Sequence, residues 1–152
     1  MCFLKSCTFF GHSDCCEPIK PLIREVLLNL IKEDVTRFYV GNNGLFDSMV
    51  ISVLKELKKE FSEISFFVVL AYLPKAKYEM ELYETIYPEG IERAPIRFAI
   101  SFRNKWMIQK SEYVVCYVTR PQGGAAQFYE MALRKNKKVI NLPDIIKQKI
   151  CR

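Results

Sequence analysis

Short apolar runs alternate along this chain with longer stretches whose apolar residues recur every three or four positions. The short runs predict five β-strands, at residues 2–10, 36–40, 64–72, 113–119 and 138–142. The periodic stretches predict helices at residues 18–33, 97–110 and 125–136, and a further helix after Gly44 whose apolar stripe runs from Met49 to Phe61. This alternation is typical of βαβ units, so we expect an α/β, Rossmann-like, doubly wound, mostly parallel five-stranded sheet with helices on both faces.

Residues 74–95 are the least regular part of the chain. Within them the pattern predicts a helix over residues 78–87 and a turn at residues 88–90, and a last short helix is expected after Pro143. The aromatic side chains of residues 78–87 are a candidate surface for a homo-oligomer. With 152 residues in all, we expect a single domain covering residues 1–152.

Composition narrows the cellular setting and the cofactor chemistry. No apolar run approaches the roughly 18 residues of a transmembrane helix, and the first ten residues do not resemble a signal peptide, so we expect a cytoplasmic protein without a membrane partner. The six cysteines form no CxxC motif and there is one histidine. We therefore expect neither a metal nor another cofactor, and reduced thiols at Cys7 and Cys116 in the predicted core strands.

The net charge of +6 favours anionic partners such as nucleotides or phosphorylated metabolites. The basic residues are scattered, which is equally consistent with an ordinary solvated surface. No basic stripe interleaved with aromatic residues is evident, so the sequence makes nucleic acid an unlikely partner and a nucleotide-like small molecule the better one.

Glycine-bearing loops follow two of the predicted strands. Residues 41–44 read Gly-Asn-Asn-Gly before one predicted helix, and Gly123 and Gly124 precede another. Glycine permits close backbone approach, and a helix N-terminus offers free N–H groups to a phosphate. The carboxyl ends of parallel strands share one edge, so we expect both loops at a common binding edge, although ordinary strand–helix turns explain each loop alone.

Arg103 is the most informative single residue. It falls on the apolar stripe of the helix predicted over residues 97–110, where an unpaired charge is costly. Arginine suits bidentate contact with a phosphate or carboxylate, although a structural ion pair or an extended, solvated side chain would also account for it.

Three further side chains are candidates. His12 follows Gly11 in the first loop and is interpreted as a phosphate contact, a proton shuttle or a plain turn residue. Asp47 lies in the first turn of its helix, where it either stabilises the helix N-terminus or binds a sugar hydroxyl. Glu130, six residues after Gly124, is either a general acid–base group or a solvent-facing residue.

The segment 103–115, together with Gly123, Gly124 and Glu130, resembles the SLOG superfamily of Rossmann-like domains. That group includes the LOG phosphoribohydrolases, the DprA recombination mediators and YpsA-like proteins, whose first two loops are similar to residues 10–12 and 41–47 here. Ala126 and Gln127 stand where the LOG pattern has a third glycine and a threonine.

The resemblance implies a pocket for a phosphate-bearing nucleotide or NAD-derived ligand, bound by a sensor or sequestering domain. The alternative that it implies is a LOG-like N-glycosidic hydrolase or deoxyribosyltransferase acting on nucleoside monophosphates, in which Arg103 and Glu130 are the catalytic residues. DprA-like single-stranded DNA binding is a weaker alternative. The ligand-binding candidates are Gly11, His12, Gly41, Asn42, Asn43, Gly44, Asp47, Arg120, Gly123, Gly124 and Ala125.

Overall fold

Six parallel strands form one twisted sheet at the centre of the computed structural model, which describes residues 4–15, 18–73 and 83–151. The sheet order is β4-β3-β2-β1-β5-β6, and every pairing is parallel. The strands are β1 (Lys5–Gly11), β2 (Val35–Val40), β3 (Ser65–Val69), β4 (Thr85–Ile86), β5 (Tyr113–Tyr117) and β6 (Lys138–Asn141).

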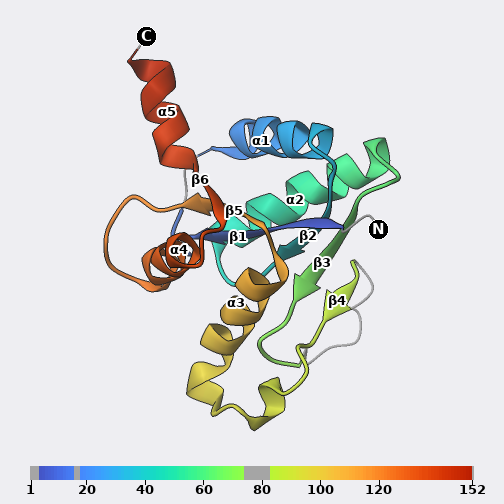
Figure 1. Ribbon diagram of the computed structural model, residues 1–152, viewed down its shortest axis with the longest axis vertical. Helices are drawn as coiled ribbons and strands as arrows, with labels where there is room; N and C mark the ends of the chain where they lie inside the picture. The colour runs from blue at the N-terminus through green and yellow to red at the C-terminus, as the bar shows by residue number, and fades with distance from the viewer. Residues whose placement is uncertain (1–3, 16–17, 74–82, 152) are drawn as a thin grey trace.

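Five α-helices of the described residues cover the two faces of this sheet (Figure 1). They are α1 (Lys20–Lys32), α2 (Leu45–Glu60), α3 (Ala99–Lys110), α4 (Gly124–Arg134) and α5 (Leu142–Ile150), and two 3-10 turns, η2 (Ile91–Arg93) and η3 (Ile96–Phe98), precede α3. Buried side chains of α1, α2 and α5 share one apolar core with the sheet, while those of α3 and α4 form a second core on the other face. The doubly wound α/β prediction is confirmed.

The strand count is the main difference from the sequence-based expectation. β4 is a sixth strand of two residues that pairs with Val68 and Val69 at the edge of the sheet. The predicted helix over residues 78–87 is therefore wrong at Thr85 and Ile86, and its part at residues 78–82 lies outside the described residues. A two-residue strand carries no readable alternation, because its existence depends on a partner strand distant in sequence.

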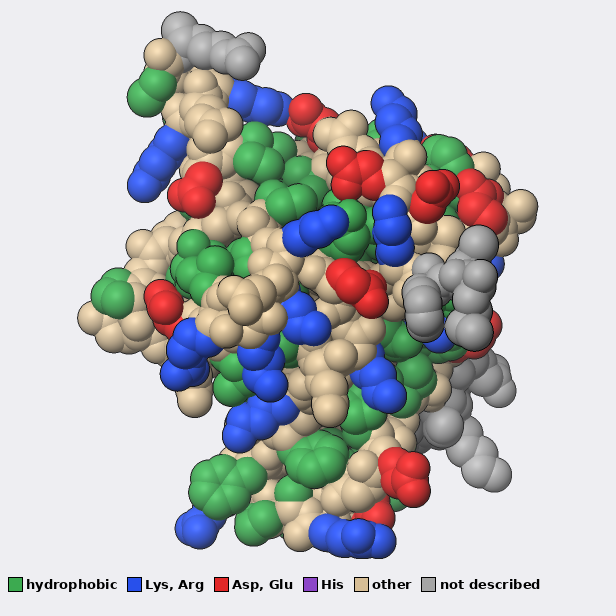
Figure 2. All heavy atoms as spheres, in the orientation of Figure 1, with side chains coloured by type: hydrophobic (Ala, Val, Ile, Leu, Met, Phe, Trp, Pro, Cys, Tyr) green, Lys and Arg blue, Asp and Glu red, His purple; other side chains and the backbone are tan. Residues whose placement is uncertain are grey.

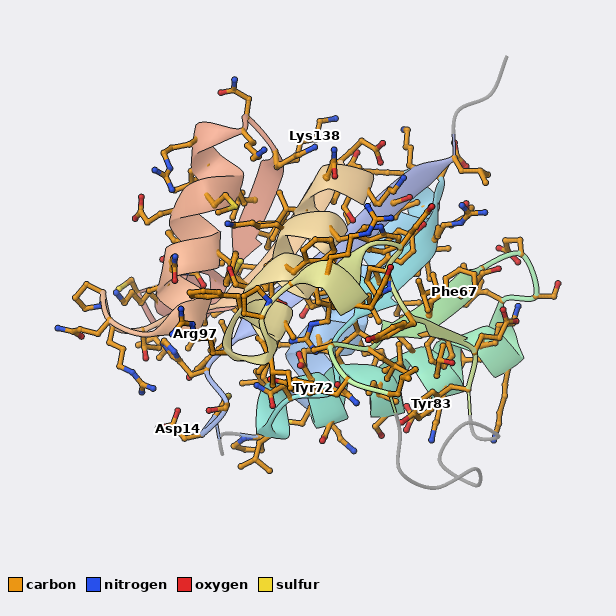
Figure 3. All side chains as sticks on the ribbon, turned by 90° about the horizontal axis from the view of Figure 1, so that it is seen from below. Asp14, Phe67, Tyr72, Tyr83, Arg97 and Lys138 are labelled. Atoms are coloured by element: carbon orange, nitrogen blue, oxygen red, sulfur yellow. The ribbon has the colours of Figure 1, made fainter. Side chains whose placement is uncertain are left out.

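The order of strands places a crevice between β1 and β5. From β1 the chain first builds outward through β2, β3 and β4, and then returns to the opposite side of β1 to add β5 and β6. In open parallel sheets, ligands bind beyond the carboxyl ends of the strands at this reversal. Figure 3 shows this edge: Asp14 and Tyr72, which follow β1 and β3, lie toward one side, and Lys138, which begins β6, lies toward the other.

Among the described residues, none of the helices combines the length and the apolar content that spanning a bilayer requires.

Candidate functional site

A cavity of about 230 Å³ opens at the β1–β5 reversal. Its walls come from the end of β1, the loops after β1, β2 and β5, the first turns of α2 and α4, and one face of α3. Fifteen residues line it: Phe9, Phe10, Gly11, His12, Ser13, Asn43, Asp47, Ile100, Arg103, Asn104, Met107, Arg120, Gly123, Gly124 and Ala125. The cavity thus gathers residues from segments that are more than one hundred positions apart in the sequence.

Arg103 lies on the buried face of α3, with 3% of its surface exposed. Its Nε donates a hydrogen bond to Asn104 Oδ1 at 3.0 Å, and its Nη1 donates to Asn42 Oδ1 at 3.3 Å. Burial lowers its pKa, and the nearby Asp47 carboxylate acts in the opposite direction. The two partners are neutral amides, so the guanidinium keeps its positive charge available to the cavity.

Asp47 is the buried carboxyl group of the cavity. It is the third residue of α2, and 8% of its surface is exposed. Its Oδ2 accepts a hydrogen bond from the backbone N–H of Asn43 at 2.9 Å. Burial raises the pKa of Asp47 to about 6, against the lowering effects of the Asn43 N–H and of Arg103. With a pKa of about 6, this carboxyl group changes its charge near pH 6.

Gly41 explains how Asp47 and Arg103 come together. A Cβ atom at Gly41 would lie 2.9 Å from Asp47 Oδ2 and 3.0 Å from Arg103 Cζ. The carboxylate and the guanidinium therefore occupy the space that a side chain at position 41 would need. In the described part of the chain the two groups form no direct ion pair. Asp47 therefore offsets the buried positive charge without blocking the guanidinium from a ligand.

The N-terminus of α4 forms another wall of the cavity. Gly123 precedes the helix with φ +97°, a left-handed conformation that favours glycine, and no side chain caps the helix. A Cβ atom at either Gly123 or Gly124 would meet nothing within 4 Å. The first N–H groups of α4 therefore lack intrahelical partners in a turn with open space beside its two glycines, which is a suitable arrangement for an anion.

Two groups join the loops after β1 and β5. Arg120 donates hydrogen bonds to both carboxylate oxygens of Asp14, at 3.1 and 3.4 Å, and this contact lowers the Asp14 pKa. The imidazole of His12, 4% exposed, accepts a hydrogen bond at Nε2 from the Thr119 backbone N–H at 3.0 Å. Burial and the charge of Arg120 lower the His12 pKa.

The structure brings nine of the predicted site residues to the cavity and leaves four away from its lining. Those at the cavity are Gly11, His12, Asn43, Asp47, Arg103, Arg120, Gly123, Gly124 and Ala125. Gly41 and Asn42 contact Arg103 instead, Gly44 packs against Ser13, and Glu130 is exposed on α4. Six residues on an α-helix correspond to a rotation of roughly 240°, which explains why Glu130 does not share a direction with Gly124.

Sequence reasoning missed several residues of the lining. Asn104, which orients Arg103, stands beside it in the sequence and offered a signal: it is a second polar residue on a helix face that is buried. The apolar residues Phe9, Phe10, Ile100 and Met107 had no such signal, because core packing accounts for them equally well. Ser13 is an exposed loop residue, and nothing in its sequence context distinguishes it from an ordinary turn serine.

The described residues contain no group of three or more His, Cys, Asp or Glu side chains that could hold a metal ion. The thiols of Cys7 and Cys116 are free and buried in β1 and β5, and burial raises their pKa. They face the apolar cores and do not line the cavity.

Comparison with known proteins identifies a structural neighbour. No family model matches the chain, and no curated protein matches its sequence. The X-ray structure of DNA processing protein A (DprA) from Streptococcus pneumoniae superimposes with a TM-score of 0.66 at 15% sequence identity. The fold is DprA-like. The match covers 90% of this chain and 49% of the DprA chain, so the chain spans about half the length of that relative.

Proposed function

We propose that the cavity binds a phosphate-bearing nucleotide or an NAD-derived, nucleotide-like ligand, and that the chain acts as a sensor or sequestering domain. One observation carries the proposal: a buried arginine and an uncapped helix N-terminus line the same cavity. A buried guanidinium is costly without an anionic partner. Arg103 has neutral hydrogen-bond partners and a carboxylate nearby but not in direct contact, which leaves a place for an anionic ligand.

The size of the cavity limits what it encloses. Pockets that bury most of a drug-sized ligand measure roughly 300–1,000 Å³, whereas this one measures about 230 Å³. A phosphate with part of its sugar fits this space, and the rest of a nucleotide would lie across the rim. Figure 2 shows Lys and Arg side chains over α3 and α4, which reflects the net charge of +6.

A thermal-shift panel tests the proposal. NAD, ADP-ribose, cyclic ADP-ribose isomers and nucleoside monophosphates are added to the purified chain, and small molecules released from it on denaturation are identified by mass spectrometry. We expect a shift with at least one phosphate-bearing member and none with the corresponding nucleoside or base. No shift with any member, on chain shown to be folded, contradicts the proposal.

A hydrolase or transferase acting on the N-glycosidic bond is the second candidate, and Asp47 is the observation that favours it. A buried carboxyl group with a pKa of about 6 beside an arginine is suited to proton transfer near neutral pH. The resemblance assigned this role to Glu130, which is exposed outside the cavity lining. Base release that is lost in Asp47→Asn and kept in Glu130→Ala would support Asp47, the reverse would support Glu130, and tight binding without turnover would exclude the enzyme.

DprA-like binding of single-stranded DNA is the third candidate, and it rests on the fold and on the net charge of +6. Contacts with backbone phosphates release counterions, so such binding would weaken steeply with salt. Fluorescence anisotropy of a labelled oligonucleotide at low and high salt measures this directly. Affinity that does not depend on salt would exclude it.

A further inference from the structure

His12 bonds the loop after β1 to the chain at and after the end of β5. Its backbone N–H donates to the Tyr117 carbonyl at the end of β5 at 3.3 Å, and its ring nitrogen Nε2 accepts the Thr119 N–H at 3.0 Å. One residue therefore connects, through backbone and side chain, the two loops that enclose the cavity.

The contact with Thr119 fixes the tautomer of the imidazole. A backbone N–H always donates, so Nε2 must carry a lone pair and no proton. Burial and the positive charge of Arg120 lower the His12 pKa, and the Asp14 carboxylate opposes them only in part. At neutral pH the ring is therefore uncharged, with its proton on Nδ1.

The other ring nitrogen of His12, Nδ1, makes no hydrogen bond to the described part of the chain. Within the described residues His12 makes the ring hydrogen bond through Nε2, and no acceptor contacts Nδ1. The one fully buried side-chain polar atom without a partner in this part of the chain is Ser111 Oγ, so Nδ1 itself is not fully buried. His12 lines the cavity together with the first turn of α4.

We propose that His12 is a specificity-determining residue that presents a neutral Nδ1–H donor, locked in place by Thr119, to an oxygen of the phosphate-type anion in the cavity. The inference rests on the proposed function and specifies one of its contacts. Arg103 and Arg120 attract the anion through their positive charge. The imidazole, held by Thr119, selects the position of one ligand oxygen, because a hydrogen bond from a fixed ring N–H requires its acceptor along the N–H direction. An anion of similar charge but different shape would not place an oxygen there.

Nuclear magnetic resonance of the ring nitrogens tests the lock without any ligand. The sequence contains one histidine, so its two ring signals need no assignment. We expect a protonated Nδ1 and an unprotonated Nε2 at pH 7, with a titration midpoint below 6.5. An Nε2–H tautomer, or a midpoint above 6.5, overturns the inference.

A matched pair of variants tests the donor. In His12→Gln the amide oxygen can take the place of Nε2 and accept the Thr119 N–H, but the donor toward the cavity is lost. In His12→Asn the amide N–H takes the place of Nδ1, but the acceptor for Thr119 is lost. With ADP-ribose as the probe, we expect His12→Gln to bind about tenfold more weakly at an unchanged melting temperature, because one hydrogen bond is lost.

His12→Asn is expected to melt at a lower temperature and to bind ADP-ribose within about threefold of the wild-type chain, since it keeps the donor. If the wild-type chain binds ADP-ribose and His12→Gln binds it equally well, the role of His12 is wrong while the proposed function stands. If the wild-type chain binds neither ADP-ribose nor any other member of the panel, the proposed function is wrong and the donor role with it.

Discussion

The two glycine loops look alike in the sequence and differ in the structure. In the loop at residues 41–44, the space beside Gly41 is filled by Asp47 and Arg103, and the space beside Gly44 is filled by Ser13. Next to Gly123 and Gly124 there is open space instead. The first loop uses glycine so that other parts of the chain can pack against its backbone, and the second leaves its backbone open to the cavity.

This difference assigns distinct tasks to the two loops. The first is a support: it holds Asp47 and Arg103 at their positions and brings α2 against the loop after β1, where Leu45 N–H bonds to the Ser13 carbonyl at 2.9 Å. The second is the proposed anion contact. Substitutions of the glycines in the first loop should therefore act mainly on stability, and substitutions of the glycines in the second mainly on binding.

Gly44→Ala should have the largest effect. Gly44 has φ +106°, and a Cβ atom there would lie 2.6 Å from the Ser13 Cα, which cannot move without its backbone. Left-handed strain and overpacking together should lower the free energy of unfolding by about 3 kcal/mol or more. Urea denaturation measures this, and a loss below about 1 kcal/mol would show that the two loops do not differ as described.

Asp47→Asn should reveal the cost of the buried carboxylate through its dependence on pH. The pKa of Asp47 is raised from 3.8 to about 6, so the folded chain binds this proton more tightly than the unfolded chain does. The contribution of Asp47 to the free energy of unfolding of the wild-type chain therefore falls as the pH rises from about 4 to about 6. Above that range this contribution is constant.

A shift of about two pKa units corresponds to roughly 3 kcal/mol. The stability of Asp47→Asn relative to the wild-type chain should thus increase by up to about that amount between pH 4 and pH 7. Urea denaturation of both proteins across this range is the measurement, with Glu130→Gln as a control at an exposed carboxylate. A difference that stays flat with pH would mean that Asp47 is ionised throughout.

Arg103→Lys should weaken binding more than it changes the fold. Lysine keeps the charge but loses the planar group that bonds Asn42 and Asn104 while facing the cavity. We expect ADP-ribose to bind roughly 10- to 100-fold more weakly in calorimetry. Arg134→Lys, at an exposed position of α4 away from the cavity lining, is the matched control and should bind as the wild-type chain does.

Gly124→Ala should have the smallest effect on stability and a clear effect on binding. Its Cβ meets nothing within 4 Å, and alanine favours helix over glycine, so the free energy of unfolding should stay within about 0.5 kcal/mol or rise slightly. The added methyl group takes up part of the open space beside the first backbone N–H groups of α4, so we expect ADP-ribose to bind several-fold more weakly. Unchanged binding would indicate that the anion does not approach this turn.

The sequence predicted the architecture well because the apolar pattern reflects which faces of each element are buried. The central strands and the helices on both faces follow from that pattern, and so does the burial of Arg103 on its helix. The short β4 did not, because two residues show no period and their pairing with β3 depends on the tertiary fold.

The site was predictable in part for a similar reason. Strand ends share one edge, so His12, Arg120 and the Gly123–Gly124 turn were expected together, and the cavity includes them all. The sequence could not show which glycine loop is open, since that depends on side chains such as Ser13 and Arg103 that arrive from elsewhere. A predicted homo-oligomer stays a prediction, and light scattering of the purified chain tests it.

Amide chemical shifts during a titration with ADP-ribose test the central claim most directly. If the anion binds between the N-terminus of α4 and Arg103, the largest changes should occur at the backbone amides of Gly123, Gly124 and Ala125 and at the Arg103 side-chain Nε–H. Changes concentrated elsewhere, for example along the lysines of α2, with these amides unmoved at saturation, would contradict the account.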